Sequence, residues 1–403
     1  MTTVKKEKKI YTWQFWMLSV SVFLFFTSFN MIVPELPAYL TSLGGEDYKG
    51  LIISLFTVTA GMSRPFSGKL ADTIGRRPIL FFGLTVSFLS ILAYPFITHV
   101  VAFFILRLLH GFSTGFAPTA SSAMIADIVP LERRGEAMGV FGLYTGIGMS
   151  LGAYLGSEIA LLTSVKTMFY FSAFVGLLSI LMMFTVRETL HRRVSFRFSM
   201  LKISSDEIVE KKVWLPSAVL LCYIFSYGVV ITTSPDMSVY LGIQNKGAYF
   251  SFSVLASLLA RIFSGKVSDQ YGRSPILTFS LSLLAFAMIL YGFAKTEWHF
   301  YLSSLLFGMG IGLSSPAVTA WVVDLSDEHA KAKAIATMFM ALEAGIGLGA
   351  FVGGELHDNQ VENFPLVGLL SSALQGIGII LLVAFGKKKD IIRQNRQAIF
   401  KHN

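Results

Sequence analysis

Apolar residues occur in long runs along this chain, and short polar segments separate the runs. Each run has about 20 residues or more, which is long enough for a helix to cross the roughly 30 Å hydrocarbon layer of a membrane. The pattern predicts twelve transmembrane helices, over residues 12–40, 49–72, 78–98, 100–126, 135–160, 165–187, 214–241, 246–268, 275–294, 297–324, 332–357 and 362–386.

Composition indicates the same class of protein. Of the 403 residues, 54% are hydrophobic and 14% are charged, which lies outside the range typical of soluble domains. We therefore predict an all-α integral membrane protein. The first run is too long for the hydrophobic region of a cleavable signal peptide, so we expect it to remain as the first helix. The single cysteine, Cys222, excludes an intramolecular disulfide and a cysteine metal cluster, and we expect it to pack in an apolar run.

The distribution of basic residues predicts the orientation, because Lys and Arg in short loops stay on the cytoplasmic side of a membrane. Most of the 33 Lys and Arg residues lie on the side that carries both predicted termini. The other side carries Lys49, Lys166, Lys246 and Lys295. We expect both termini in the cytoplasm, and the short loops favour a bacterial cytoplasmic (inner) membrane. The net charge of +9 follows from this topology, so it requires no nucleic acid partner.

One long polar segment, 188–213, separates six runs from six. It predicts an N-terminal six-helix bundle at 1–187, a cytoplasmic linker at 188–213, and a C-terminal six-helix bundle with a short cytoplasmic tail at 214–403. We expect the linker to be a solvated tether, although its basic residues would also suit anionic lipid head groups.

The two predicted bundles repeat one another. Residues 68–78 resemble residues 265–275, and the offset of 197 also aligns glycines and an aspartate further along the chain. The aligned residues are Gly111, Gly115, Asp127, Gly148, Gly152 and Gly156 with Gly308, Gly312, Asp324, Gly345, Gly349 and Gly353. Residues 33–40 resemble 234–241 at an offset of 201. Repeated halves that enclose a site between them are a recurring plan of membrane transporters.

The segment between the second and third runs reads Gly-Lys-Leu-Ala-Asp-Thr-Ile-Gly-Arg-Arg. With this segment and its copy, the chain resembles the major facilitator superfamily over essentially its whole length. The resemblance implies two pseudo-symmetric six-helix halves, and a charge relay that latches the cytoplasmic side when the protein faces outward. The relay residues would be Asp72, Arg76 and Asp127 in the first half and Asp269, Arg273 and Asp324 in the second. The alternative is simple anchoring of the loops by basic residues.

The run 100–126 contains Arg107-Leu-Leu-His110-Gly111, which is similar to an Arg-x-x-Gln-Gly pattern of that family, with His110 in the Gln position. An arginine inside a membrane normally faces a partner or a wet cavity. Glu35 lies at a comparable depth, so the two residues can pair, and Glu35 can then exchange a proton for the arginine or for a cationic substrate. The alternatives are a static structural pair and, for His110, a hydrogen-bonded packing role.

Glu343 lies in the middle of the run 332–357, where the repeat places Gly146 in the first half. Carboxylates inside a membrane are functional candidates by default. We predict a proton carrier or a contact for a cationic substrate, with structural hydrogen bonding as the alternative. Asn30, in the first run, is a further candidate for the substrate site.

Three other charged residues lie in or beside the runs. Asp236 mirrors Glu35, but no arginine mirrors Arg107, so its partner is left open. Arg64 and Arg261 precede the motif aspartates by about two turns, and we expect their side chains to reach the cytoplasmic interface.

The glycines of the run 135–160 are similar to the antiporter motif of the exporting branches of the family. They are Gly148, Gly152 and Gly156, but Ala153 stands where the family has Pro, and Ser157 where it has Gly. Small residues let helices approach closely. We expect them to form a hinge or seal between the fifth and eighth helices, with plain packing as the alternative.

These features predict a secondary active transporter that works by alternating access. The chain looks most like drug- and sugar-efflux permeases, which implies proton-coupled export of a small amphipathic compound. The alternatives are proton symport, with uptake of an organic acid or sugar, and, more distantly, a membrane-embedded enzyme. No Gly-x4-Gly-Lys-Ser/Thr segment for ATP is present. We expect no metal, no cofactor other than the proton gradient, no catalytic residues, and a monomer in the bilayer.

Overall fold

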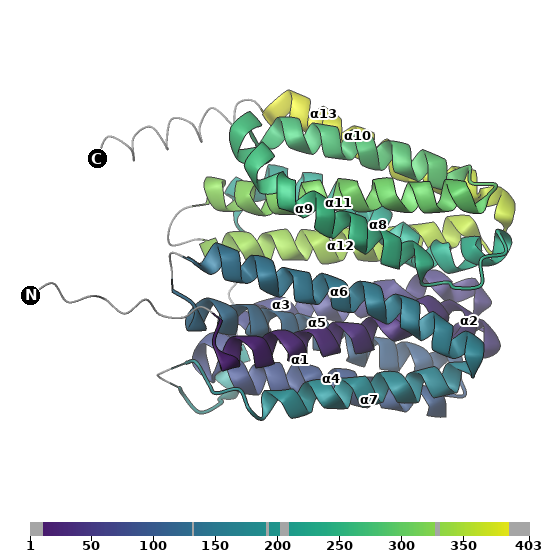
Figure 1. Cartoon of the computed structure of the whole chain (residues 1–403). Coiled ribbons are helices and arrows are strands. Elements are labelled where there is room, and N and C mark those ends of the chain that lie inside the picture. Colours follow the sequence, from purple (N-terminus) through teal and green to yellow (C-terminus); the bar gives the residue numbers. More distant parts are fainter. Residues whose placement is uncertain (1–10, 131–132, 191–192, 202–208, 327–330, 387–403) are drawn as a thin grey trace, which may run out of the picture.

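The computed structural model describes residues 11–130, 133–190, 193–201, 209–326 and 331–386. Every regular element in this part of the chain is helical. The helices lie side by side in one elongated bundle (Figure 1). We call the end that carries residues 184–190 and 193–201 the linker end, at the left in Figure 1, and the opposite end, which carries α2, the far end.

The first set of helices runs from α1 to α7. Its elements are α1 (Trp13–Ile32), the 3-10 turn η1 (Val33–Glu35), α2 (Leu36–Ser42), η2 (Glu46–Tyr48), α3 (Lys49–Thr73), α4 (Arg76–Ala93), η3 (Tyr94–Phe96), α5 (Val100–Ile128), α6 (Arg134–Leu162) and α7 (Val165–Met183). The predicted first helix is broken at η1, because Pro34 and Pro37 have no backbone N–H to donate.

The second set runs from α8 to α13. Its elements, with the short helical turns of the linker, are η5 (Phe198–Leu201), η7 (Lys211–Val213), α8 (Trp214–Tyr240), α9 (Ala248–Tyr271), α10 (Arg273–Gly292), α11 (Glu297–Leu325), α12 (Lys331–His357), η9 (Val361–Asn363), α13 (Phe364–Leu381) and the π-helical turn η10 (Leu382–Gly386).

Ten helical segments in the described part of the chain are long and apolar enough to cross a membrane. The two other predicted spans correspond to α3 and α9, which have 25 and 24 residues but are more polar. Their polarity has a structural reason, because α3 and α9 carry Arg64 and Arg261 toward the interior of the bundle.

The repeated motif forms the same turn twice. Gly75 connects α3 to α4 with φ 134°, and Gly272 connects α9 to α10 with φ 95°. A side chain is strained at such positive φ values, so glycine is required at both turns.

Each helix packs mainly within its own set. In the first set α1 packs on α6 and α7, and α5 packs on α3 and α4; in the second, α8 packs on α12 and α13, and α11 packs on α9 and α10. The two sets meet where α3 packs on α12 and where α6 packs on α9. At the far end of the first of these contacts, the backbones of Gly50 and Gly354 touch.

The glycines of the antiporter-like motif lie on a different contact from the predicted one. A Cβ atom added to Gly148, Gly152 or Gly156 would collide with the α1 backbone at Phe23, Thr27 and Met31. These glycines therefore allow close packing of α6 on α1, within one set. The expected seal between the fifth and eighth helices, α6 and α9, is instead made by other residues.

That seal contains a reciprocal pair of hydrogen bonds. The Ser150 hydroxyl donates to the Ser251 carbonyl oxygen at 3.0 Å, and the Ser251 hydroxyl donates to the Ser150 carbonyl oxygen at 2.8 Å. Nearby, Gly247 lies against the backbone of Ala153. Ala153 is the residue that replaces the family's proline, so this departure from the motif lies on the contact between α6 and α9.

Gly156→Val should destabilise the protein, because the new side chain cannot fit against the Met31 backbone without moving α1. We expect a loss of about 1–3 kcal/mol, the usual cost of overpacking, seen as a lower midpoint of thermal unfolding in detergent. Gly139→Val, in the same helix, is the control, because a Cβ there meets no atom within 4 Å. Equal midpoints for the two variants would contradict this packing.

Candidate functional site

A central cavity of about 540 Å³ lies between the two sets of helices. Its wall is mostly apolar and includes Phe29, Phe56 and Phe307, with Tyr223 as one of its polar groups. The charged residues that line it in the described part of the chain are Arg64, Arg261 and Glu343. This size and lining suit a drug-sized organic molecule held by a few polar contacts.

Arg64 and Glu343 form an ion pair across the two sets. Arg64 Nη2 lies 2.7 Å from Glu343 Oε1, and the side chains are only 13% and 8% exposed. The guanidinium also lies over the Phe339 ring, 4.6 Å from its centroid. The expectation that Arg64 reaches the cytoplasmic interface is therefore wrong, because a buried carboxylate on α12 holds it at the cavity wall.

The predicted pairing of Glu35 with Arg107 is also wrong. Glu35 Oε2 lies 2.8 Å from Lys246 Nζ, and Glu35 Oε1 accepts a hydrogen bond from the Ser157 hydroxyl at 2.7 Å. Sequence spacing did not give the direction of the Glu35 side chain. Lys246 approaches from the second set, just before α9 begins.

Arg107 lies within the first set. Its Nε donates to the Ile52 carbonyl oxygen at 2.7 Å, its Nη1 donates to the Tyr94 hydroxyl at 3.2 Å, and its guanidinium lies 4.6 Å from the centroid of the Phe56 ring. His110 is fully buried, and its ring nitrogens lie 3.3 Å from the Ser87 hydroxyl and 3.4 Å from the Tyr94 hydroxyl. This geometry matches the packing interpretation of His110.

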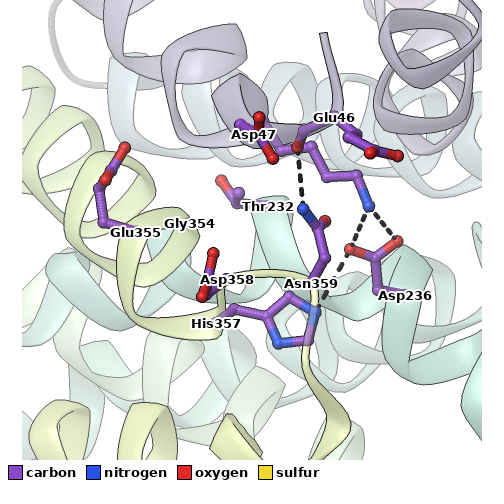
Figure 2. Close-up of a pocket in the computed structure, with 10 residues that line it drawn as sticks. Glu46, Asp47, Thr232, Asp236, Gly354, Glu355, His357, Asp358 and Asn359 are labelled. Carbon is purple, nitrogen blue, oxygen red and sulfur yellow. Dashed lines mark hydrogen bonds and ion pairs between the residues drawn. The ribbon is translucent and has the colours of Figure 1, made fainter. Parts of the chain in front are cut away.

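Asp236, whose partner the sequence left open, pairs with the first set of helices. Its carboxylate lies 2.9 Å from Lys49 Nζ and 3.4 Å from His357 Nε2. Figure 2 shows these contacts beside the Asn359 side chain, which donates to the Glu46 carbonyl oxygen at 3.1 Å. Together they tie α8 and the end of α12 to the start of α3 at the far end.

The two far-end ion pairs are related by the sequence repeat. Glu35 corresponds to Asp236 at the offset of 201, and Lys49 corresponds to Lys246 at the offset of 197. Each set therefore contributes one carboxylate and one lysine, and each carboxylate binds the lysine of the other set. We call these two pairs the reciprocal clasp.

At the linker end, the motif residues form ion pairs within their own sets. Arg76 lies 2.8 Å from Asp72 and 3.2 Å from Asp127. Arg273 lies 3.1 Å from Asp324 and donates to the Ser268 hydroxyl at 2.7 Å. The side chain of Asp269 lies outside the part of the chain that the structure describes.

Glu188, which the sequence analysis did not single out, lies beside the first of these clusters. Its carboxylate accepts hydrogen bonds from the backbone N–H groups of Arg76 and Arg77 at 3.1 and 3.0 Å. The neighbouring Thr189 hydroxyl donates to Asp127 at 2.7 Å. The start of the linker is thereby fixed to the motif. A carboxylate directly after the sixth apolar run was the available signal.

Asn30 lines the central cavity, as expected for a substrate-site candidate, and its side chain donates to the Phe26 carbonyl oxygen at 2.9 Å. Among the described residues, no group of three or more His, Cys, Asp or Glu side chains has an arrangement that holds a metal ion.

A bundle of apolar helices around a central cavity, with two sets of helices joined by buried and half-buried ion pairs, is the architecture of a membrane transporter. The model of the Major Facilitator Superfamily matches residues 18–245 and again residues 217–399. The chain belongs to this family, and it is a transporter rather than an enzyme.

Two curated relatives are efflux proteins by name. The chain is 24% identical to the quinolone resistance protein NorA of Staphylococcus aureus over 378 residues, which cover 92% of this chain and 96% of NorA. It is 26% identical to the multi-drug resistance efflux pump PmrA homolog of Lactococcus lactis over 361 residues, which cover 84% and 86% of the two chains. These similarities support the drug-efflux branch of the family.

Solved transporter structures share the fold. The human organic anion transporter MFSD10 superposes with a TM-score of 0.70 at 20% identity and covers 92% of this chain and 98% of its own. The nucleoside transporter NupG gives a TM-score of 0.70 at 15% identity and covers 93% and 99%.

Asp236→Asn should loosen the reciprocal clasp, because Lys49 loses its charged partner. The reporter is a cysteine introduced at Thr232, which is buried beside this pair, in a Cys222→Ser background. We expect a maleimide reagent to label this cysteine several-fold faster in Asp236→Asn than in the parent. The charge-swapped variant Lys49→Asp with Asp236→Lys should return the labelling rate toward that of the parent. Equal rates in all three proteins would show that the pair does not hold the far end closed.

Proposed function

We propose that this protein is a secondary active transporter that exports a small amphipathic compound in exchange for protons. Its six-helix halves, 1–187 and 214–403, would rock about the central cavity and expose it to each side of the membrane in turn. The linker end and both termini would face the cytoplasm. The observation that carries this proposal is the Arg64–Glu343 ion pair at the cavity wall.

The position of this pair suits it for coupling. Glu343 is the carboxylate that lines the central cavity in the described part of the chain, and it is bonded to the other half. Protonation of Glu343 removes its charge and so removes most of the attraction that holds α3 to α12 at this level. One proton can thereby change both the charge of the cavity and the cost of separating the halves.

The reciprocal clasp supports a state with the far end closed. Both of its ion pairs join the two halves, whereas the Arg76 and Arg273 ion pairs at the linker end each lie within one half. We infer that the linker-end clusters take part in the opposite closure, as a charge relay that latches the cytoplasmic side. The names of NorA and of the PmrA homolog support export of a drug-like compound.

Glu343→Gln should abolish transport driven by a pH gradient, because the glutamine cannot bind or release the coupling proton. We expect at least a tenfold lower rate of substrate-evoked proton flux in proteoliposomes, tested with a quinolone, a sugar and an organic acid. Glu355→Gln is the control, because this exposed carboxylate lies on the same helix at the far end.

Proton flux that persists in Glu343→Gln would remove Glu343 from the coupling mechanism. The sign of the flux separates export from uptake: substrate efflux against proton entry supports antiport, and co-directional movement supports the symport alternative.

A further inference from the structure

Arg261 has an environment that differs from that of its repeat-related partner. The offset of 197 relates Arg64 on α3 to Arg261 on α9. It also relates Phe339 and Glu343 on α12, which both contact Arg64, to glycines on α6. The residues that correspond to Phe339 and Glu343 are Gly142 and Gly146.

The structure confirms that the two contacts have the same register. Gly61 on α3 lies against the Glu343 side chain, and its counterpart Leu258 on α9 lies against Gly146. The contact of α9 with α6 is therefore equivalent to the contact of α3 with α12. At this equivalent contact, both the carboxylate and the aromatic ring are absent.

The Leu258 side chain fills the space at Gly146, but the space at Gly142 is open. Arg261 lines the central cavity and also a second cavity of about 750 Å³ between α6, α9 and α11. Gly142 lines both cavities, and a Cβ atom added to it would meet nothing within 4 Å. Asp324, the carboxylate that lines the second cavity, pairs with Arg273. No described residue forms a hydrogen bond or ion pair with Arg261.

The charge of the central cavity is consequently unbalanced. Arg64 and Glu343 neutralise each other, and Arg261 leaves one positive charge on the wall. The Arg261 side chain is exposed at this wall, so it is accessible to a ligand that enters the cavity. Tyr223 of α8 lines the same cavity, and its hydroxyl adds a second polar group.

We propose that Arg261 is an anion-binding subsite of the central cavity and that the transported compound is an amphipathic organic carboxylate. A planar guanidinium binds a carboxylate through two parallel hydrogen bonds, which gives both strength and orientation. The apolar wall of the cavity would hold the rest of the molecule. The identification of this substrate class rests on the proposed transport function, whereas the subsite itself is tested by binding alone.

The experiment compares two fluorescent probes that differ in charge at one group, dansylglycine and dansylglycinamide. Binding is measured by fluorescence with purified full-length protein in detergent, without any gradient. We expect the wild type to bind the carboxylate at least tenfold more tightly than the amide. Arg261→Gln should abolish this preference and keep the affinity for the amide, and Arg261→Lys should retain part of the preference.

A second variant supplies the missing partner from the protein. Gly146→Glu combined with Leu258→Gly copies the Glu343–Gly61 arrangement to the other side of the cavity. We expect it to reduce the preference for dansylglycine as much as Arg261→Gln does. Retained affinity for the amide and an unchanged elution volume in size-exclusion chromatography serve as the controls for folding.

An equal affinity of the wild type for both probes, or no binding of the carboxylate, overturns the proposal. A preference that survives Arg261→Gln overturns it as well. The same binding measurement in nanodiscs of phosphatidylglycerol and of phosphatidylcholine tests whether the bound anion is a lipid phosphate. If the preference for dansylglycine over dansylglycinamide is lost only in phosphatidylglycerol, the anionic lipid occupies the subsite, and the subsite is assigned to lipid. The probe-binding measurements use no gradient, so their outcome does not depend on whether Glu343→Gln loses proton coupling. The two proposals therefore fail separately.

Discussion

A charged side chain inside a membrane is stable only beside an opposite charge, a polar partner or water, and this constraint organises the interior of the protein. The charges that join the two sets of helices are paired: Arg64 with Glu343, Glu35 with Lys246, and Lys49 with Asp236. Arg107 satisfies the same constraint with a carbonyl oxygen, a hydroxyl and an aromatic ring. The ion pairs are therefore among the points at which the two sets hold each other.

The repeat relates two ion pairs at the far end, but at the cavity only one of the two repeat-related arginines has a carboxylate partner among the described residues. In the reciprocal clasp, each set contributes one carboxylate and one lysine, so the repeat relates the two far-end ion pairs to each other. At the cavity wall, Arg64 has a carboxylate partner, whereas Gly146 occupies the position equivalent to Glu343 on the side of Arg261. Repeat-related ion pairs at the far end suit a contact whose role is to join the two sets. Asymmetry at the cavity suits a part that must bind an asymmetric molecule.

Sequence reasoning predicted the helices well because apolar run length is a local property. Ten predicted spans correspond to helical segments that can cross a membrane, and the motif segments gave the correct neighbours of Arg76 and Arg273. Partners across the two sets were missed, because the direction of a side chain around a helix axis depends on how two distant helices pack. Glu35 and Arg64 were assigned by depth alone. The repeat itself held a usable signal for Lys246, since Lys49 occupies its equivalent position.

The backbones of α3 and α12 touch at Gly50 and Gly354. Nearer the linker end, the long side chains of Arg64 and Glu343 bridge the same two helices. Arg64 lies about 21 Å along α3 from Gly50, at 1.5 Å per residue. A tilt of α3 by about 10° over that length would move Arg64 by roughly 4 Å. A tilt of this size is enough to break the ion pair of Arg64 with Glu343.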